Sequence, residues 1–408
     1  MNPSLDVVIV GNGVAGVTAA RIIKEKNSKA RVSIYTDEIH QYYPRPRLYD
    51  VLSGEVTPSE IYVFSGKWYE NSGIQVHLKK KAVGLDFDRK ELLLENGSRV
   101  DYDRLVLASG GHSFIPPIKG VDKTGVFALR SIKDALTIRE FTKKSKKAIV
   151  IGGGLLGLEF ATSLRKLVQQ VEVVEIFPRL LPRQLDQYGA AILKNRIASR
   201  GIDFILGAKT VEILGRDIVS GIQLDSGVEV SGDLVLVSAG MRSNVQLAME
   251  AGIKVNRGVV VDGYLRSSAD DVYAIGDVAE FEGRVYGIIP AAVDQARIAA
   301  KNVLEEEKEV YTGSIPSNML KIVDIDLASM GIVNPEEDRY EEIKRIDDEK
   351  GIYKKLVLDQ GKIVGAIILG DRQGITAIKR LMTQKTDITK HKHSILADNF
   401  DYKKVAER

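Results

Sequence analysis

The sequence predicts an α/β fold in which two similar parallel-sheet units precede a smaller α+β region. Two observations predict this fold class. An apolar run, a glycine-rich string and a helical stretch follow one another from residue 7 and again from residue 148. Strands that alternate with helices in this way form parallel sheets. Beyond residue 314 the pattern changes to strand-like runs and one amphipathic helix, which is typical of a small α+β domain.

The first unit starts with a short apolar run at residues 7–10, which has the length of a buried strand. The string Gly11-Asn12-Gly13-Val14-Ala15-Gly16 follows it, and residues 17–26 have a helical pattern. Residues 31–35 form the next strand-like run. This order predicts a βαβ unit with the glycines at its first turn.

The second unit repeats this order. Residues 148–151 are apolar, the string Gly152-Gly153-Gly154-Leu155-Leu156-Gly157 comes next, and residues 158–167 have a helical pattern. Residues 171–176 form the second strand-like run of this unit. The sequence therefore predicts a second βαβ unit.

The rest of the chain contains shorter signals. A strand-like run at 272–275 is followed by Gly276-Asp277 and by a helical run at 291–304. In the last region we expect strands within 320–333, 353–358 and 363–369, a hairpin loop at 359–362 and a helix at 375–382.

The glycine strings suit a particular chemistry. Glycine permits a tight turn and lets backbone N–H groups approach a pyrophosphate. The helix that follows presents the positive end of its dipole to the phosphate charge. A plain strand-to-helix turn would explain one such string. Two strings, each in a complete βαβ frame, favour two Rossmann-like dinucleotide-binding domains.

An acidic residue about 20 positions after the glycines is expected to bind a ribose hydroxyl. In the second unit this residue is Glu175, which favours NADH because a carboxylate repels the 2′-phosphate of NADPH. Arg179 keeps NADPH open as an alternative, because a guanidinium can receive that phosphate. In the first unit the position is Thr36, with Asp37 and Glu38 after it, so the contact is made by the hydroxyl or by one of these acids.

The composition narrows the class of protein. With 408 residues, 44% of them apolar and 28% charged, the chain has the balance of a folded protein of two or three domains. It contains no cysteine, which excludes disulfides, thiolate nucleophiles and Cys-ligated metals. The net charge of +3 indicates neither a nucleic-acid nor a membrane partner. High Lys, Glu and Ile content without cysteine is a tendency of heat-adapted proteins.

The sequence predicts neither a membrane span nor a metal site. No apolar run approaches the roughly 18 residues that a bilayer requires, and the N-terminus lacks a basic leader, so we expect a cytoplasmic protein. His391 and His393 form a His-x-His in a basic tail, but two ligands without nearby acids make a poor metal site. From Lys379 the chain has eight Lys or Arg against four Asp or Glu, and we expect this tail to be partly mobile.

With these motifs in place, the chain resembles the two-dinucleotide-binding-domain flavoproteins, the FAD-dependent pyridine nucleotide oxidoreductases. Besides the glycine strings, the matching pieces are residues 105–111, 237–240 and 272–277. The chain looks most like NAD(P)H:rubredoxin oxidoreductases and the flavin-binding part of assimilatory nitrite reductases, and residues 320–331 are similar to their C-terminal domain. The implied domains are an FAD-binding domain at 1–112 and 242–312, an NAD(P)H-binding domain at 113–241, an α+β domain at 313–385 and a basic tail at 386–408.

The resemblance implies which residues hold the cofactors. Asp277 would bind a ribityl hydroxyl of FAD, the helix at 291–304 would point its N-terminus at the flavin, and Arg45 and Pro46 would lie along the flavin ring. The implied FAD residues are Gly11, Gly13, Ala15, Gly16, Thr36, Asp37, Glu38, Arg45, Pro46, Val83, Ala108, Ser109, Gly110, Arg130, Gly276, Asp277, Pro290 and Ala291. The implied NAD residues are Gly152, Gly154, Leu155, Leu156, Gly157, Glu159, Glu175 and Gly240.

The chain also departs from its relatives. Disulfide-reducing members have a redox cysteine just after the loop at 42–48, and this chain has none. Ferredoxin-reductase relatives have a lysine that pairs with the glutamate equivalent to Glu159, but Asp50 occupies the lysine position. Leu155 stands where many relatives have an aromatic residue over the flavin, and ordinary packing is the alternative role. No catalytic acid or base is implied, because the chemistry belongs to the flavin.

The resemblance implies a reaction in two halves, with hydride passing from NADH to flavin N5 and electrons then passing to a redox protein such as rubredoxin or ferredoxin. An NADH oxidase that uses O₂ or small acceptors is one alternative, and a flavin-binding or signalling module without turnover is another. The basic tail either steers an acidic partner or is plain solvated surface. A monomer and a homodimer both remain open.

Overall fold

The computed structural model describes residues 5–305, 308–322 and 325–406. The chain forms two compact units. The first consists of Met1–Leu48, Val56–Phe114 and Met241–Ser314, and the second of Tyr49–Glu55, Ile115–Gly240 and Ile315–Arg408. We describe each unit by itself.

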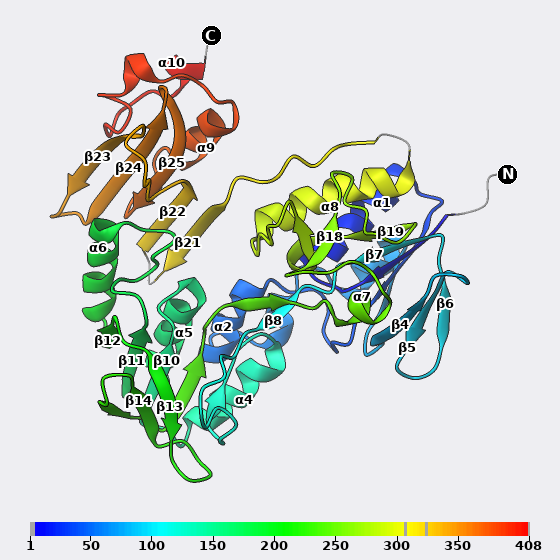
Figure 1. Cartoon of the computed structure of the whole chain (residues 1–408), viewed down its shortest axis with the longest axis horizontal. Helices are drawn as coiled ribbons and strands as arrows, with labels where there is room; N and C mark the ends of the chain where they lie inside the picture. The colour runs from blue at the N-terminus through cyan, green and yellow to red at the C-terminus, as the bar shows by residue number, and fades with distance from the viewer. Residues whose placement is uncertain (1–4, 306–307, 323–324, 407–408) are drawn as a thin grey trace. The chain divides into compact units, whose positions relative to one another are not determined.

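The first unit is built on a five-stranded parallel sheet with the strand order β19-β7-β1-β2-β3; Figure 1 labels β7 and β19 of this sheet. Its strands are β1 (Asp6–Val10), β2 (Arg31–Tyr35), β3 (Ile74–His77), β7 (Arg104–Leu107) and β19 (Val272–Ala274). Helices α1 (Val14–Lys26) and α8 (Ile289–Leu304) pack against each other on this sheet. Ile9, Ile34 and Leu105 are fully buried between these layers, and burial of each such side chain contributes about 1.5–3 kcal/mol.

The second unit contains a parallel sheet with the order β12-β11-β10-β16-β9, in which β12-β11-β10-β16 correspond to β3-β2-β1-β7 of the first unit. Its strands are β9 (Val126–Phe127), β10 (Lys147–Ile151), β11 (Gln170–Glu175), β12 (Ile202–Leu206) and β16 (Leu234–Val237). Helices α4 (Ile132–Thr142), α5 (Leu155–Arg165) and α6 (Gln187–Ala198) belong to this part of the chain. Both predicted βαβ units are therefore confirmed.

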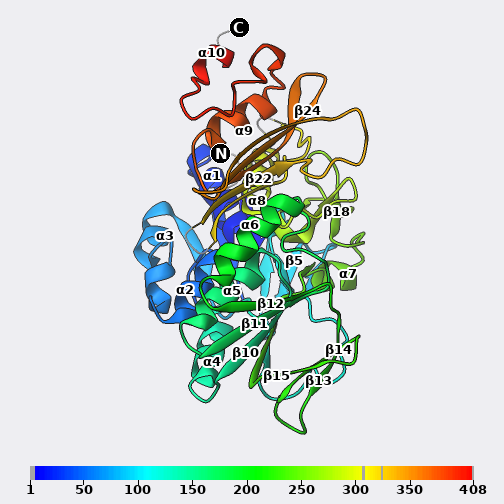
Figure 2. The same cartoon turned by 90° about the vertical axis from the view of Figure 1, so that its left-hand side faces the viewer.

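Each parallel sheet carries an antiparallel three-stranded sheet, which is inserted in the chain between β3 and β7 in the first unit and between β12 and β16 in the second. The first consists of β4 (Ala82–Asp86), β5 (Glu91–Leu94) and β6 (Arg99–Asp101), and the second of β13 (Thr210–Leu214), β14 (Gly221–Leu224) and β15 (Glu229–Ser231). Figure 2 shows β13–β15 as a small sheet apart from β10–β12. Both insertions have a register shift in their first strand, so the duplication extends beyond the glycine strings.

Short elements complete the two units. In the first unit they are η1 (Arg45–Arg47), η2 (Pro58–Ile61), α3 (Gly66–Ser72), β8 (Gly111–Ser113), β17 (Met241–Ser243), α7 (Gln246–Glu250), β18 (Val259–Val261), η3 (Gly276–Val278) and β20 (Ala279–Phe281). Strands β8 and β17 pair with each other, as do β18 and β20. Helix α2 (Leu48–Ser53) falls almost entirely within the second unit.

The C-terminal region of the second unit is an antiparallel five-stranded sheet with the order β21-β22-β25-β24-β23. Its elements are β21 (Ser317–Ile322), β22 (Ile325–Gly331), β23 (Glu341–Asp347), β24 (Ile352–Asp359), β25 (Lys362–Leu369), α9 (Ile375–Thr383), η4 (Thr389–His391) and α10 (Lys403–Ala406). The predicted hairpin and helix are confirmed. Of the predicted run at 320–333, Val323 and Asp324 lie outside the described residues.

The expectation of a partly mobile tail is wrong for most of that segment. Ile388, Ile395, Leu396 and Val405 are buried in one apolar cluster with residues of α9. Their side chains belong to the same core as residues of β22, β24 and β25 in the C-terminal sheet. Among the described residues, no helix is long and apolar enough to cross a membrane.

Candidate functional site

The first glycine string has a backbone that only glycine allows. Gly11 has φ +115°, and its N–H donates to the Tyr35 carbonyl at 2.8 Å. A Cβ on Gly11 would lie 2.2 Å from the carbonyl oxygen of Ala108, and one on Gly16 would lie 2.1 Å from that of Gly11. Around Gly13, in contrast, a Cβ would meet nothing within 4 Å. The string is therefore closely packed at Gly11 and Gly16 and open at Gly13.

The second glycine string repeats these relationships. Gly152 has φ +116°, and its N–H donates to the Val174 carbonyl at 2.8 Å. A Cβ on Gly152 would lie 2.3 Å from the carbonyl oxygen of Ser238, and one on Gly157 would lie 2.0 Å from the carbonyl oxygen of Gly152. A Cβ on Gly154 would again meet nothing within 4 Å. The two strings therefore share one backbone geometry.

The open glycines stand where a pyrophosphate would approach. Gly13 is the N-cap of α1 and Gly154 that of α5, and neither helix start has a side-chain cap. The first N–H groups of a helix lack intrahelical partners and attract anions. Within the described part of the chain, the buried Asn12 Nδ2 also has no hydrogen-bond partner. The residues present fit a dinucleotide pyrophosphate in each unit.

Thr36 and Glu175 occupy equivalent positions, each directly after the residue whose carbonyl accepts from the first glycine. Both are buried. Glu175 accepts hydrogen bonds from the N–H groups of Gly153, at 2.6 Å, and Phe177, at 2.9 Å. Because an ionised carboxylate oxygen can accept more than one hydrogen bond, Glu175 retains capacity for a ribose hydroxyl. Asp37, next to Thr36, is exposed.

The structure brings together two residues that the sequence analysis treated separately. Arg45 forms an ion pair with Glu38, and its guanidinium lies 4.7 Å from the centre of the Tyr43 ring. The Tyr43 hydroxyl donates to Glu38 at 2.6 Å. Burial lowers the pKa of Arg45, but the attraction of Tyr43 and Glu38 outweighs it and raises the pKa above its ordinary value. Arg45, beside Pro46 in η1, is therefore a fixed cation.

The Gly276-Asp277 pair lies beside the first glycine string. Gly276 has φ +76°, and a Cβ there would lie 2.9 Å from the Cβ of Ala15. Its N–H donates to Gln295 of α8 at 2.7 Å. Helix α8 starts with Pro290 in its first turn and Ala291 buried, and it has no side-chain cap. Within the first unit, the residues predicted for FAD thus converge from three distant parts of the chain.

Two residues that sequence reasoning missed hold this convergence. The Ser243 hydroxyl donates to the Asp277 carbonyl at 2.7 Å. Asn244 donates its side-chain amide to the Ser109 carbonyl at 2.8 Å and its N–H to the Gly110 carbonyl at 2.9 Å. Ser243 and Asn244 come shortly after Gly240, and only this proximity to the motif at 237–240 could have indicated them.

The remaining predicted residues lie as follows. Val83 is exposed in β4, at the register shift of that strand, and Ala108 is buried at the end of β7. In the second unit, Leu156 is exposed and Glu159 buried on α5. Arg130, also in the second unit, donates its backbone N–H to the Asp134 carboxylate at the start of α4. Gly240 has φ +108°, in the left-handed region that favours glycine. Among the described residues, no group of three His, Asp or Glu could hold a metal ion.

Two dinucleotide-type loops on duplicated parallel sheets define a protein with two dinucleotide-binding domains. The chain belongs to the pyridine nucleotide-disulphide oxidoreductase family, whose model matches residues 5–296. Residues 316–386 match the C-terminal domain of rubredoxin NAD+ reductase.

Individual relatives support this membership. A nitrite reductase [NAD(P)H] of Bacillus subtilis is 38% identical over 94% of this chain and 48% of its own length. An NADH-rubredoxin oxidoreductase of Clostridium acetobutylicum is 30% identical over 92% of this chain and 94% of its own. A solved ferredoxin reductase of Rhodopseudomonas palustris is 27% identical with a TM-score of 0.88, and covers 98% of this chain and 99% of its own. The chain spans about half the length of the nitrite reductases it matches.

Proposed function

We propose that the chain is an FAD-dependent NAD(P)H oxidoreductase that takes hydride from NADH and passes electrons to a small redox protein such as a rubredoxin or ferredoxin. The observation that carries this proposal is the pair of glycine strings with one geometry in one chain. We assign FAD to the first string, because Asp277 and α8 converge on it. We assign NADH to the second, because Glu175 follows it.

When bound, FAD supplies the ring that accepts the hydride and releases the electrons. The chain's residues supply position and charge. The N–H groups of α1 hold the FAD pyrophosphate, and those of α5 hold that of NADH. Asp277 accepts from a ribityl hydroxyl, the uncapped start of α8 stabilises negative charge on the ring, and Arg45 adds a fixed positive charge. In the same proposal, Arg130 contacts FAD, Glu159 lies near the flavin ring, and Leu155 belongs to the NADH loop.

The acceptor is external to the chain in this proposal. The sequence contains no cysteine, so the chain cannot relay electrons through a disulfide of its own, although its family is named for that chemistry. The match of residues 316–386 to a rubredoxin reductase domain supports a small redox protein as the acceptor. The names of the Clostridium and Rhodopseudomonas relatives point the same way.

A second candidate acceptor is a nitrite reductase component. The identity of 38% to the Bacillus nitrite reductase favours it. In that case the chain would correspond to the electron-input half of a larger system. The two candidates share the NADH half-reaction and differ only in the second half.

Three further expectations belong to the proposal. We propose a cytoplasmic location, where NADH is produced, and a heat-adapted source, which the high Lys, Glu and Ile content supports. We also propose separate domains with the boundaries that the sequence analysis gives. A thermal unfolding curve and limited proteolysis test the last two.

An anaerobic titration of the purified protein with NADH tests the proposed function. The flavin absorption should bleach with one equivalent of NADH per FAD, and rubredoxin added afterwards should restore it. Recovery only with a nitrite reductase component would favour the second candidate. Rapid NADH consumption in air without any added protein would favour an oxidase, and a flavin that NADH does not bleach would contradict all three.

A further inference from the structure

The segment that follows Glu175 packs against the second glycine string. We call residues 176–186 the wall loop. The Leu181 N–H donates to the Gly153 carbonyl at 3.3 Å. The Leu180 side chain lies so close that a Cβ on Gly153 would be 2.9 Å from its Cδ2 atom. Since Glu175 binds the Gly153 N–H, the wall loop and Glu175 together fix the glycine string from one side.

The wall loop has a strained backbone that needs support. Leu181 has φ +49°, in the left-handed region that side chains other than glycine rarely adopt. Such conformations persist only where surrounding contacts hold them, and they cluster at functional sites. Leu180, Leu181 and Leu185 are fully buried, so the loop is anchored from inside the unit.

The C-terminal region of the same unit supplies a second set of anchors. The Asn334 amide donates to the carbonyls of Pro182 and Leu185, each at 3.2 Å. The Tyr353 hydroxyl donates to the Asp186 carboxylate at 2.5 Å. Figure 1 shows α6, which begins just after Asp186, beside the C-terminal sheet. The far end of the wall loop is therefore tied to that sheet.

A buried lysine strengthens this tie. Lys355 is only 3% exposed, and its ammonium group lies 3.2 Å from Asp186 and 2.5 Å from Glu342. A buried cation is tolerated only with close anionic partners. The other Asp186 oxygen accepts from the Gly189 N–H at 3.0 Å and so caps α6. Asp186 thus joins the wall loop, α6 and β24.

We propose that Asn334, Tyr353 and Lys355 are positioning residues for the NADH site. They hold the wall loop against Gly153, so the C-terminal region sets the affinity for the nicotinamide dinucleotide without touching it. This inference rests on the proposed function, which assigns NADH to the second glycine string.

Tyr353→Phe and Asn334→Ala test the proposal in the full chain with FAD bound. Isothermal titration with NAD+ should give a Kd about three- to tenfold above that of the unchanged protein, the range of typical coupling energies. With ferricyanide as acceptor, the KM for NADH should rise to a similar extent while kcat stays constant. The FAD-to-protein ratio should not change. Lys355→Met should also raise the Kd for NAD+. If Lys355→Met does not fold, Tyr353→Phe still tests the proposal.

Tyr188→Phe is the matched control. Its hydroxyl donates to Asp348 at 2.7 Å and therefore also links α6 to the C-terminal region, but outside the wall loop. Its Kd for NAD+ should equal that of the unchanged protein. The proposal is overturned if Tyr353→Phe and Asn334→Ala bind NAD+ normally, or if Tyr188→Phe weakens binding equally. Failure of the unchanged, flavin-loaded protein to bind NAD+ would instead contradict the proposed function itself.

Discussion

Gly157 faces Gly152 so closely that a Cβ on Gly157 would lie 2.0 Å from the Gly152 carbonyl oxygen. No side chain fits there without a shift of backbone. Gly154, between them in sequence, has open space instead, and its φ of −76° suits any residue. Within this string, therefore, Gly157 is required for the backbone to fold, and Gly154 leaves space for a ligand to approach the backbone.

This contrast predicts the effect of Gly154→Ala. The variant should fold with an unchanged melting temperature, because the new methyl group meets no protein atom. Its Kd for NAD+ should rise by about tenfold or more, because the methyl group occupies the approach of the pyrophosphate. Calorimetric titration with NAD+ measures this change.

Gly13→Ala should weaken the binding of FAD and leave the binding of NAD+ unchanged. Gly13 has the same open surroundings as Gly154, but it lies in the string that we assign to FAD. Each variant is thus the control for the other. Equal loss of both ligands in both variants would show that the two strings do not serve separate sites. Gly157→Ala should lower the melting temperature, which Gly154→Ala does not, because a Cβ on Gly157 would meet the Gly152 carbonyl oxygen.

Glu175→Gln should shift the cofactor preference. The amide still accepts from one N–H of Gly153 or Phe177 but loses the charge that repels a 2′-phosphate. We expect kcat/KM for NADH to fall by about 10- to 100-fold, as for a lost hydrogen bond to a charged group. The value for NADPH should fall less or rise.

Glu172→Gln is a suitable control, because Glu172 lies on the same strand as Glu175 but forms an ion pair with Lys147 of β10, at 2.7 Å. It should leave both values of kcat/KM unchanged. A native preference for NADPH would contradict the assignment of Glu175 from the start.

The first unit should become less stable as the pH falls from neutrality into the mildly acidic range. His77 stacks on Tyr35 with ring centres 4.5 Å apart, and burial, together with nearby Lys80, lowers its pKa below the ordinary 6.5. Above pH 6.5 the histidine is neutral in both the folded and the unfolded chain and contributes nothing. As pH falls below 6.5, the unfolded chain binds the proton first, so stability declines until the pH passes the folded pKa.

The melting temperature of His77→Gln should therefore fall less than that of the unchanged protein when the pH is lowered from about 7.5 to about 5.5. Parallel pH profiles for the unchanged protein and His77→Gln would refute this contribution.

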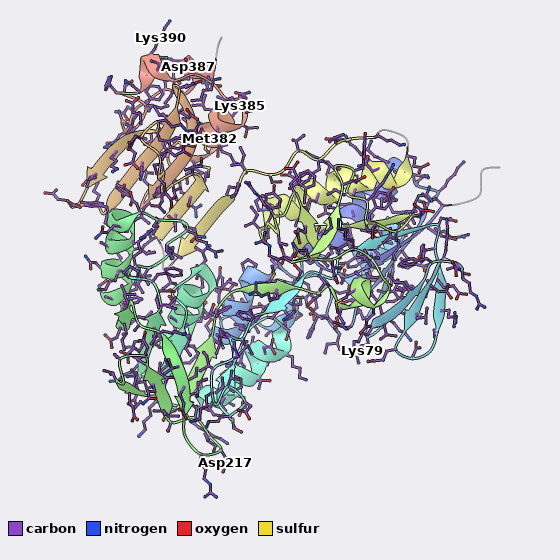
Figure 3. The ribbon with its side chains drawn as sticks, viewed as in Figure 1. Lys79, Asp217, Met382, Lys385, Asp387 and Lys390 are labelled. Carbon is purple, nitrogen blue, oxygen red and sulfur yellow. The ribbon has the colours of Figure 1, made fainter. Side chains whose placement is uncertain are left out.

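Exposed lysines of the C-terminal region should assist encounter with an acidic acceptor. Figure 3 shows Lys385 and Lys390 at this end of the chain, with Lys390 pointing outward. Lys385→Glu with Lys390→Glu should lower kcat/KM for rubredoxin by about two- to tenfold at low salt, and the difference should vanish at high salt. The rate of flavin bleaching by NADH should not change.

Lys79→Glu, an equally exposed change in the first unit, is the net-charge control for Lys390→Glu alone, because the two single changes alter the charge equally. If it slows rubredoxin reduction as much as Lys390→Glu does, steering by the C-terminal lysines is wrong. The basic residues of the tail are then plain solvated surface.

Local signals account for what could be predicted. The strand Arg31–Tyr35 was predicted with its observed bounds, and the helix predicted at 375–382 extends by one residue. Glycine strings, the periodic spacing of apolar residues and turn residues each act over a few positions. Each can therefore be recognised in a single sequence. The equivalence of Thr36 and Glu175 also follows from position alone, and the backbone bonds of Tyr35 and Val174 agree with it.

Contacts between distant residues could not be predicted in this way. The run around Lys355 gives no sign that a cation lies buried against Asp186, which is 169 positions away. Asn244 and Ser109 are 135 positions apart, and the tail residue Ile395 becomes core only when α9 packs beside it.

By itself, the sequence determined the two nucleotide-type loops and the absence of thiol chemistry, because both depend on residue type within a short stretch. Only the tertiary structure decided which side chains support those loops. That choice depends on burial and on pairing of charges across the fold, and these exist only once remote strands have come together.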